Sequence, residues 1–419
     1  MSFETISVIG LGYIGLPTAA MFASRKKKVI GIDVNQHAVD TINQGKIHIV
    51  EPDLDMIVSA AVSEGYLKAN TTPEPADAFL IAVPTPFLPC EEGEVPAPDL
   101  SYIEAASKAI APVLKKGDLV ILESTSPVGA TEQMAAWLAE ARSDLTFPQT
   151  HGDNADVNVA HCPERVLPGH VVRELVENDR VIGGMSARCS ERSVELYKTF
   201  VLGECVVTNA RTAEMAKLTE NSSRDVQIAF ANELSIICDK LDINVWELIA
   251  LANRHPRVNI LQPGPGVGGH CIAVDPWFIV SKTPEEAQII HTARKVNDAK
   301  PDWVIDKVKL AVFNFLQDNP GKTARDITIA CYGLAFKPDI DDLRESPAVK
   351  ITQEIAKMHA GRVISIEPNV SDVPTNMRNV ELVDSDIARQ EADIEVILVA
   401  HKQFKQYKFK SNFICCVNL

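Results

Sequence analysis

The sequence has no pair of cysteines in the C-x-x-C spacing, although it holds nine cysteines in 419 residues. This pattern disfavours both a zinc ribbon and a disulfide framework, and it predicts free thiols in a reducing compartment. The sequence also lacks an apolar run of the roughly 18 to 20 residues that a membrane-spanning helix needs. No basic leader precedes the first strand-like run. We therefore expect a cytoplasmic protein with no membrane segment.

The sequence is also short of positive charge. It holds 41 Lys and Arg residues and 56 Asp and Glu residues, which gives a formal net charge of −15. Binding a polyanion requires a basic surface, so this charge argues against a nucleic-acid binder. A small anion is still possible where basic side chains are concentrated. The length of 419 residues and the apolar content of 46% are typical of two or three globular domains.

The N-terminal stretch combines two strands with a glycine-rich turn. Thr5–Ile9 predicts a strand, Gly10–Gly15 reads G-x-G-x-x-G, and the helical pattern Leu16–Ser24 leads to a second strand that ends before Asp33. This order is the dinucleotide fingerprint, whose glycines make the turn, admit the pyrophosphate and allow close packing. Asp33 should bind ribose hydroxyls and repel a 2′-phosphate, which favours NAD over NADP. The predicted NAD contacts are Gly10, Gly12, Tyr13, Ile14, Gly15 and Asp33.

Two further βα units follow the fingerprint. The strand-like runs Ala78–Val83 and Asp118–Leu122 are each followed by a loop that carries hydroxyl groups. Loops at the carboxyl ends of strands bind ligands in doubly wound sheets. Thr85, Thr125 and Thr131 are therefore candidates for cofactor contacts, although hydroxyls in such loops are equally often helix caps.

A later strand that begins at Asn158 runs into a turn in which Glu164 stands next to Arg165. A carboxylate beside a guanidinium suits acid–base chemistry next to an anionic ligand. An exposed Glu-Arg pair is also a common surface feature without function. The local sequence leaves both interpretations open.

A period of 3.6 from Thr212 to Lys240 predicts one long helix. Lys217, Asn221 and Arg224 have the spacing i, i+4 and i+7 and lie on one face of that helix. A polar stripe is usually a solvated face. It becomes a site if the glycine-rich loop further along the chain packs against it, because Lys217 and Asn221 could then polarise a hydroxyl or an oxyanion.

That glycine-rich loop is Pro263–Pro276, which holds four glycines between Gly264 and Gly269, then Cys271 and Asp275. The glycines let a ligand lie against the backbone. If a helix begins after Gly269, Cys271 lies near its N-terminus, where a thiolate is favoured, and Asp275 shares its face. The loop predicts a nucleophilic cysteine. The alternative is a tight connection followed by a buried thiol.

The C-terminal third predicts a second α/β sheet without a full G-x-G-x-x-G. Its strands are expected at Ile327–Tyr332, Val363–Ile366 and Ile394–Val399. Lys337 and Arg344 follow the first of these strands and suit a second anionic ligand. We expect an α/β protein with two doubly wound Rossmann-like domains joined by a helical central domain with a long helix. The predicted domains are residues 1–208, which bind NAD, 209–318, which carry the cysteine loop, and 319–419, which bind a second nucleotide.

Seven motifs, in this order along the chain, resemble the UDP-glucose/GDP-mannose 6-dehydrogenase family. They are Gly10–Gly15, Pro84–Pro86, Ser124–Thr125, Pro163–Arg165, Lys217 with Glu220–Asn221, Gly264–Asp275, and Phe336–Lys337 with Asp341–Pro347. The segments His255–Val258 and Gly269–Trp277 resemble the N-acetylhexosamine branch of that family. The resemblance therefore covers nearly the whole chain.

The resemblance implies a chemistry. The C6 alcohol of UDP-N-acetyl-D-mannosamine would be oxidised to the uronate with two NAD molecules, feeding a bacterial surface polysaccharide of the enterobacterial common antigen type. Lys217 and Asp275, with a water, would assist deprotonation of the hydroxyl. Cys271 would carry the aldehyde as a thiohemiacetal and then as a thioester, which Glu164 would help water to hydrolyse. Lys217 and Asn221 would stabilise the oxyanion.

The resemblance also implies the substrate contacts and the assembly. The sugar-nucleotide contacts would be Arg165, Val166, Lys217, Asn221, Arg224, His255, Arg257, Gly268, Phe336, Lys337 and Arg344. No metal is implied, and a homodimer or a larger homo-oligomer is expected. The residues Phe413–Leu419 depart from the family, because they lack the Asp and the basic residue that members usually carry there.

Three alternatives remain open at this point. UDP-N-acetylglucosamine differs from the mannosamine compound only at C2, and one buried contact can discriminate the two. A β-hydroxyacid-type dehydrogenase would share the N-terminal domain and the long helix but would not need the cysteine loop. A catalytically impaired sugar-nucleotide-binding protein would fit the altered C-terminal segment.

Overall fold

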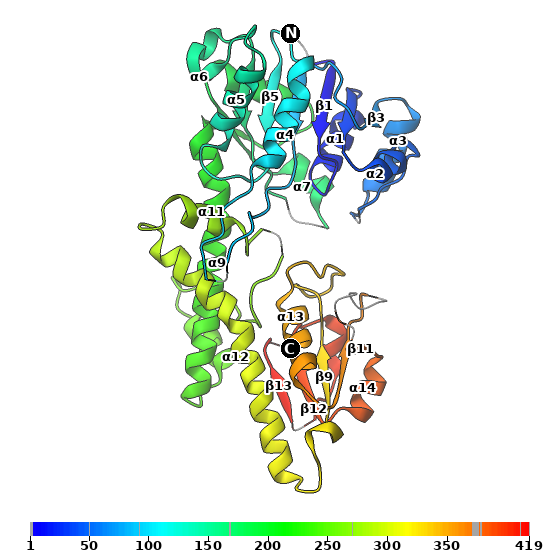
Figure 1. The fold of residues 1–419 in the computed structure, drawn as a ribbon, viewed down its shortest axis with the longest axis vertical. Helices are drawn as coiled ribbons and strands as arrows, with labels where there is room; N and C mark the ends of the chain where they lie inside the picture. The colour runs from blue at the N-terminus through cyan, green and yellow to red at the C-terminus, as the bar shows by residue number, and fades with distance from the viewer. Residues whose placement is uncertain are drawn as a thin grey trace. The chain divides into compact units, whose positions relative to one another are not determined.

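The computed structural model describes residues 3–49, 51–91, 93–166, 169–269, 271–370, 377, 379–410 and 412–418. The chain divides into two compact units, Met1–Glu220 with Trp277–Lys282, and Asn221–Pro276 with Thr283–Leu419. Figure 1 shows the strands and helices of each unit. The sequence-based division into three domains stays a prediction.

The first unit contains an eight-stranded sheet in the order β3-β2-β1-β4-β5-β6-β7-β8. Its neighbouring strands are parallel except β6 and β7, which are antiparallel. The order from β3 to β6 is that of a Rossmann sheet, whose switch point lies between β1 and β4. The strands are β1 Thr5–Ile9, β2 Lys28–Ile32, β3 Leu67–Asn70, β4 Ala78–Ile81, β5 Leu119–Leu122, β6 Asn158–His161, β7 Arg180–Gly184 and β8 Cys205–Asn209.

Helices cover both faces of this sheet. Strands β4, β5 and β6 are buried along their whole length, because helices shield both faces of the middle of the sheet from water. One face packs against α1 Gly15–Ser24, α3 Leu54–Ser63, α7 Val171–Glu177 and α8 Ala187–Tyr197, and the other against α4 Ser101–Ile110 and α5 Ala130–Ala141. The unit also contains α2 Gln36–Asn43, α6 Pro148–His151 and two short 3-10 turns at Ala111–Val113 and Gly152–Asn154.

Two helices of 31 residues each, α9 Ala210–Lys240 and α12 Gln288–Asp318, dominate the middle of the chain. Between them lie α10 Val245–Ala252 and α11 Asp275–Lys282. The predicted long helix is confirmed by α9, whereas α12 was not predicted. None of the helices in the part of the chain that the structure describes is long and apolar enough to cross a membrane.

The second unit contains a five-stranded parallel sheet in the order β11-β10-β9-β12-β13. Residues of α12 and α13 Pro347–Met358 form its core on one face, and α14 Ser385–Glu391 covers the other. The strands are β9 Thr328–Tyr332, β10 Arg362–Ile366, β11 Glu381–Leu382, β12 Ile394–Ile397 and β13 Phe413–Cys415, with 3-10 turns at Ala324–Asp326 and Lys402–Gln406. The fold class expected from the sequence is confirmed.

Candidate functional site

The Gly10–Gly15 turn joins β1 to α1 at the switch point of the first sheet. Gly10 has a φ of +89°, and its N–H donates to the Ile32 carbonyl at 2.8 Å. A Cβ on Gly15 would lie 1.7 Å from the Gly10 oxygen, whereas a Cβ on Gly12 would meet no described atom within 4 Å. Among the described residues, no side chain caps the N-terminus of α1. The turn therefore leaves open the approach that a pyrophosphate needs, and its residues fit NAD.

Asp33 follows β2 and reaches back to this turn. It is half-buried, and its Oδ2 accepts a hydrogen bond of 2.9 Å from the Leu11 N–H. Its Oδ1 accepts one of 2.9 Å from the Asn35 N–H. Tyr13 is exposed and Ile14 is half-buried on the same turn. The structure thus places all six predicted contacts of this group together, and their role toward NAD stays a prediction.

The three candidate threonines differ in their surroundings. Thr85 is 7% exposed, and its hydroxyl has no hydrogen-bond partner among the described residues, so a ligand atom could satisfy it. Thr131 is fully buried, and its hydroxyl donates to Glu214 at 2.6 Å. Burial raises the pKa of Glu214, although the hydrogen bonds from Thr131 and Gly129 counteract it. Thr125 is half-buried. Thr85 therefore suits a ligand contact better than Thr131.

Glu164 lies just after β6 and is 7% exposed. Its Oε2 accepts a hydrogen bond of 2.7 Å from Arg180, and its Oε1 accepts one of 2.6 Å from the Arg165 N–H. The Arg165 guanidinium pairs with Glu220 of α9 at 2.6 Å, so its charge already has a partner. Val166 packs against the core. Glu164 is thus a nearly buried carboxylate whose two oxygens are both held.

The cysteine loop is fastened to α9 near both of its ends. The Gly264 N–H donates to Asn232 of α9 at 2.9 Å, and the Asn221 amide of α9 donates to Asp275 at 2.5 Å. Asp275 is 3% exposed. The expected packing of the loop against this helix is therefore present at Asn221. Lys217 lies one helical turn before Asn221 and is half-buried.

Cys271 is exposed in the turn that leads into α11. Its carbonyl accepts hydrogen bonds from the N–H groups of Val274 at 3.1 Å and Asp275 at 2.9 Å. The regular helix begins at Asp275 and not directly after Gly269, so the cysteine stands one turn ahead of α11. The thiol is accessible to a substrate, and its nucleophilic role stays a prediction.

The cysteine loop also packs against the loop that follows β9. A Cβ on Gly268 would lie 2.7 Å from the Phe336 Cβ, and the Gly269 N–H donates to the Arg344 carbonyl at 3.3 Å. Three predicted substrate residues, Gly268, Phe336 and Arg344, are thereby brought together. Lys337 and Arg344 are exposed, and Arg344 forms an ion pair with Asp342 at 2.6 Å.

Three predicted substrate residues lie on exposed surface. Arg224 is exposed on α9, and His255 and Arg257 are exposed in the segment after α10. The Arg257 N–H donates to the His255 ring at 3.3 Å. The roles of Arg224, His255 and Arg257 as contacts of the sugar nucleotide stay predictions.

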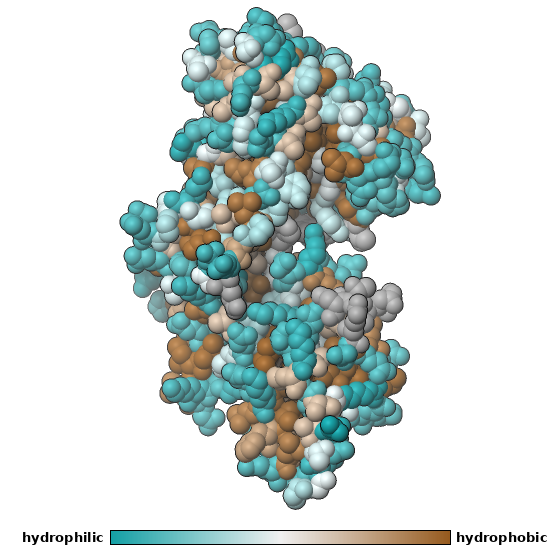
Figure 2. All heavy atoms as spheres, in the orientation of Figure 1, coloured by the Kyte–Doolittle hydropathy of each residue, from teal (hydrophilic) through white to brown (hydrophobic). Residues whose placement is uncertain are grey.

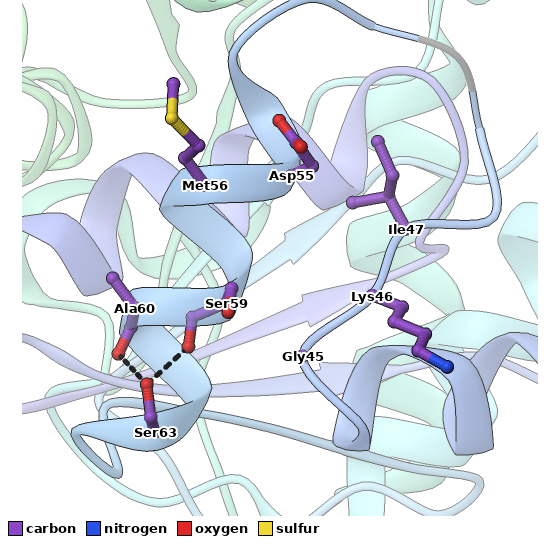
Figure 3. A pocket seen from close by; sticks show the side chains of 8 residues that line it. All are labelled: Gly45, Lys46, Ile47, Asp55, Met56, Ser59, Ala60 and Ser63. Atoms are coloured by element: carbon purple, nitrogen blue, oxygen red, sulfur yellow. Dashed lines mark hydrogen bonds between the residues drawn. The ribbon is translucent and has the colours of Figure 1, made fainter.

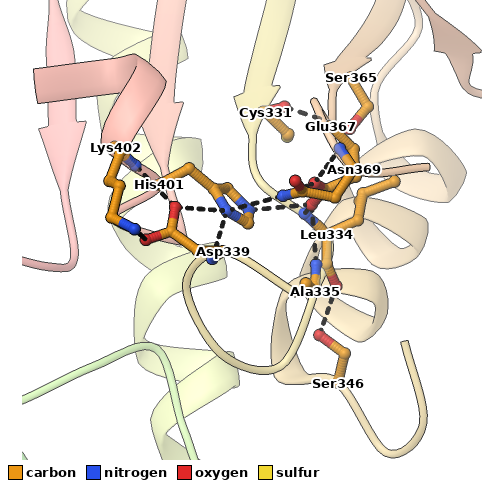
Figure 4. Close-up of polar contacts among 10 residues, drawn as sticks. All are labelled: Cys331, Leu334, Ala335, Asp339, Ser346, Ser365, Glu367, Asn369, His401 and Lys402. Atoms are coloured by element: carbon orange, nitrogen blue, oxygen red, sulfur yellow. Dashed lines mark hydrogen bonds and ion pairs between the residues drawn. The ribbon is translucent and has the colours of Figure 1, made fainter. Parts of the chain in front are cut away.

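A buried Glu-His pair in the second sheet was not predicted from the sequence (Figure 4). Glu367 follows β10, and its Oε2 accepts hydrogen bonds from the Leu334 and Ala335 N–H groups at 2.8 and 3.0 Å. His401 lies 3.0 Å from the same oxygen, and its Nδ1 accepts a hydrogen bond from the Asp339 N–H at 2.9 Å. Nε2 therefore carries the ring proton. An acidic residue after the second strand was the available signal, since Asp33 has that position in the first sheet.

Burial alone would raise the pKa of Glu367. The hydrogen bonds from His401, Leu334 and Ala335 outweigh burial and lower it. The carboxylate is therefore held in its charged form inside the second unit. Its contacts fix the start of the loop that carries Phe336 and Lys337.

An open pocket of about 740 Å³ lies between the Gly45–Ile47 turn and α3 (Figure 3). The Ser63 hydroxyl beside it donates to the carbonyl of Ser59 at 2.6 Å. None of the predicted site residues lines this pocket. Among the described residues, no three His, Cys, Asp or Glu side chains are arranged to hold a metal ion.

The fold and these residues define a dehydrogenase with two nucleotide-binding sheets. Three family models match the chain: the NAD binding domain of the UDP-glucose/GDP-mannose dehydrogenase family at residues 4–201, its central domain at 211–299 and its UDP binding domain at 330–414. The chain belongs to the UDP-glucose/GDP-mannose dehydrogenase family. The family expected from the motifs is confirmed.

Relatives within the family are close. The chain is 69% identical to a UDP-N-acetyl-D-mannosamine dehydrogenase from Yersinia pestis, over 97% of this chain and 96% of that protein. It is 64% identical to an NDP-N-acetyl-D-galactosaminuronic acid dehydrogenase from Ralstonia solanacearum, over 97% of this chain and 93% of that protein. The structure of a UDP-D-ManNAc dehydrogenase from Pyrococcus horikoshii superposes with a TM-score of 0.85 at 38% identity, covering 99% of this chain and 95% of that one.

Proposed function

We propose that the protein oxidises the C6 alcohol of UDP-N-acetyl-D-mannosamine to the carboxylate, with NAD as the oxidant, in a four-electron reaction. The observation that carries the proposal is the exposed thiol of Cys271, one helical turn before an Asp275 that is hydrogen-bonded to Asn221. NAD bound at the Gly10–Gly15 turn would accept a hydride in each oxidation. The protein's own residues supply the remaining chemistry.

The alcohol step needs a group that takes the hydroxyl proton. In this proposal Asp275 and a water take it, with the Lys217 ammonium polarising the oxygen. The hydrogen bond from Asn221 leaves Asp275 with a fixed orientation. The amide of Asn221 and the ammonium of Lys217 stabilise negative charge that develops on the substrate oxygen.

The aldehyde step explains why a cysteine is needed. The thiolate of Cys271 adds to the aldehyde carbon, and the resulting thiohemiacetal is oxidised to a thioester without release of the aldehyde. Glu164 then takes a proton from the water that attacks the thioester. The C–S bond breaks, and the uronate and the free thiolate are the products.

The sugar nucleotide has a binding surface at the loop after β9. The ring of Phe336 lies against Gly269, with its Cε2 3.0 Å from the position of a Cβ there, and the cationic groups of Lys337 and Arg344 are exposed on the same loop. These side chains suit a uracil ring and a diphosphate. Arg165, Val166, Arg224, His255 and Arg257 remain further predicted contacts.

The experiment measures the number of NADH molecules formed per sugar nucleotide consumed. Four sugar nucleotides are offered separately, each with NAD. UDP-N-acetylmannosamine should give two NADH per molecule, and UDP-glucose should give none. UDP-N-acetylglucosamine and UDP-N-acetylgalactosamine are the competitors, the second because of the relative from Ralstonia. If either competitor gave two NADH per molecule and the mannosamine compound gave none, that competitor would be the substrate in place of UDP-N-acetylmannosamine. No NADH with any of them would contradict the activity.

Cys271→Ser tests the covalent route. We expect acid formation to fall by at least about 1000-fold, because loss of a covalent nucleophile commonly costs that much or more. Cys90→Ser is the matched control, since Cys90 is also an exposed thiol. It should keep the full rate. Unchanged acid formation by Cys271→Ser would contradict the route.

We further propose that the protein is a homodimer. The second unit exposes several large apolar side chains to water, and a second copy of the chain would cover them. Figure 2 shows apolar surface over the lower part of α9. The exposed apolar side chains are those of Phe230, Ile237, Leu241, Ile243 and Leu251. Sedimentation equilibrium should give twice the mass of 45.8 kDa, and Ile237→Glu should give the single mass. A monomeric wild-type protein would contradict this.

None of the nine cysteines forms a disulfide in the structure, which suits a reducing compartment. We therefore place the reaction in the cytoplasm. Supply of the product to a surface polysaccharide of the enterobacterial common antigen type remains a prediction. Loss of that polysaccharide on deletion of the gene is the measurement that checks it.

A further inference from the structure

A buried polar cluster lies behind Glu164 in the first unit. Glu123 follows β5, Arg180 begins β7 and Tyr197 ends α8. Glu123 is 1% exposed, Arg180 4% and Tyr197 0%. Sequence analysis did not single out these residues, because their proximity depends on the order of the strands in the sheet.

Arg180 lies between two carboxylates. Its Nη2 donates to Glu164 Oε2 at 2.7 Å, and its Nη1 stands 3.6 Å from Glu123 Oε1. The Tyr197 hydroxyl donates to Glu123 Oε1 at 2.5 Å. The guanidinium carbon lies 4.4 Å from the centre of the Tyr197 ring, so the ring also holds the guanidinium in place. Glu164 is therefore connected to Glu123 through one shared cation.

The charges in this cluster do not cancel. Two carboxylates share one guanidinium, and Glu123 Oε2 and Arg180 Nη1 have no hydrogen-bond partner among the described residues. A buried ion pair of this kind is weak support for stability, because apolar residues of similar size often serve as well. The contribution of the cluster to stability therefore does not explain why these charged residues are buried together.

The titration of Glu123 is consistent with a role other than stabilising the fold. The pKa of Glu123 is raised to about 7, because burial and the charge of Glu164 raise it by more than Arg180 and the Tyr197 hydroxyl lower it. The groups that face Glu123 are Arg180, Glu164, Tyr197 and the thiol of Cys162, whose own pKa is raised by burial. Glu123 thus changes charge close to neutral pH, next to the carboxylate that acts in hydrolysis.

We propose that Arg180 and Glu123 are positioning residues for Glu164: Arg180 fixes the carboxylate for attack by water on the thioester, and ionised Glu123 offsets the cation so that Glu164 stays a competent base. The inference rests on the proposed role of Glu164 in the hydrolysis. Neither residue touches the reacting atoms. Each acts only through Glu164.

The step that they support is balanced. A water oxygen attacks the thioester carbon while Glu164 takes one water proton, and the C–S bond then breaks to give the carboxylic acid and the Cys271 thiolate. The acid loses its proton to solvent at neutral pH, and Glu164 returns its proton to solvent. Loss of the negative charge of Glu123 leaves the cation of Arg180 uncompensated beside Glu164, which makes Glu164 a weaker base.

The variants are Arg180→Met, which removes the cation, and Glu123→Gln, which removes the charge and keeps the shape. Arg192→Met is the matched control, because Arg192 also lies over a ring, that of Phe3 at 4.0 Å, and pairs with Glu195. The measurements are the rate of NADH release in the first turnover, the steady-state rate from pH 5 to 9 and the intact mass of the protein during turnover.

We expect Arg180→Met to slow hydrolysis by roughly 100-fold while the first NADH burst changes by less than about threefold. The mass should then show the uronyl thioester on Cys271. Glu123→Gln should slow hydrolysis several-fold, shift the rising limb of the pH profile to lower pH and leave the burst intact. Arg192→Met should change neither the burst nor the pH profile.

In an active wild-type protein, two results would overturn the inference. One is a Glu123→Gln protein whose pH profile and thioester level equal those of the wild type. The other is an equal slowing of burst and hydrolysis in Arg180→Met together with a lowered melting temperature, since that pattern belongs to a structural role. If the wild-type protein forms no NADH, the proposed function itself is wrong and this inference is overturned with it.

Discussion

The two sheets of the protein begin with the same turn and then diverge. Gly10 and Gly333 both have a positive φ, +89° and +92°, and each N–H donates at 2.8 Å to the last residue of the neighbouring strand, Ile32 or Ile366. An acidic residue follows that strand in both cases, as Asp33 and as Glu367. The two switch points therefore share the glycine turn, its hydrogen bond to the neighbouring strand and the acidic residue after that strand.

The difference lies in what the acidic residue does. Asp33 is half-buried and accepts one hydrogen bond from the glycine turn, whereas Glu367 is 5% exposed and accepts two from its turn and lies 3.0 Å from His401. The first helix starts at Gly15, but in the second sheet the helix starts only at Pro347, after the loop that carries Lys337. The same combination of a glycine turn and an acidic residue thus suits dinucleotide binding in the first sheet and anchors a loop in the second.

The largest expected effect contrasts the two acids. Glu367→Ala should lower the free energy of unfolding by about 3 kcal/mol, because it leaves two buried N–H groups and a buried histidine without their acceptor. Asp33→Ala should lower it by less than about 1 kcal/mol but should weaken NAD binding. Urea unfolding of both variants, with NAD titrations, measures the contrast. Equal losses of stability would break the comparison.

Acid should remove part of the same interaction. The pKa of Glu367 is lowered in the folded protein, so its contribution to stability is present above its unfolded pKa near 4.5 and is lost as the pH falls through the folded pKa. Unfolding midpoints from pH 7 to pH 3 should therefore fall less steeply in Glu367→Gln than in the wild type. Parallel curves would show that Glu367 does not carry this dependence.

Gly12→Ala should weaken NAD binding by about tenfold, or 1.4 kcal/mol, because the new Cβ occupies space that the pyrophosphate needs. Gly321→Ala is the matched control. Both glycines have open space at the Cβ position within the described structure, and neither has a positive φ. Stability should change by less than about 1 kcal/mol in both. Normal NAD affinity in Gly12→Ala would place the cofactor elsewhere.

The smallest effect concerns Thr85. Thr85→Val removes a buried hydroxyl that has no partner among the described residues. We expect NAD affinity to fall about fivefold, since a hydrogen bond of about 1 kcal/mol is lost, and stability to stay equal or rise. Calorimetric titration and thermal unfolding measure the two quantities. Lower stability with unchanged affinity would make Thr85 a structural residue.

Local patterns made much of the fold predictable. The strand at Thr5–Ile9 and the long helix that ends at Lys240 agree with the structure closely, because each depends on the periodicity of its own segment. The helix α12 was missed because Pro301 lies inside it, and proline ordinarily ends a helix. The antiparallel pairing of β6 with β7 was missed because it depends on the order of strands in the sheet.

The residues of the candidate site likewise fall into those that could be predicted from the sequence and those that could not. The glycine turns and the stretch around Cys271 were visible because several unusual residues stand next to one another in the sequence. Glu367 with His401, and Glu123 with Arg180, were not visible, since the two members of each pair are 34 and 57 positions apart and meet only through the order of the strands in their sheets. Contacts of that kind need the topology, which single-sequence patterns do not supply.

The most direct test of the comparison is a pair of titrations, NAD and UDP separately, into the wild type, Asp33→Asn and Lys337→Ala. Asp33→Asn should weaken NAD about tenfold and leave UDP within twofold. Lys337→Ala should weaken UDP about tenfold, as expected for loss of a charged hydrogen bond, and leave NAD within twofold. If both variants weaken the same ligand, or if neither variant changes either affinity, the division of labour between the two sheets is contradicted.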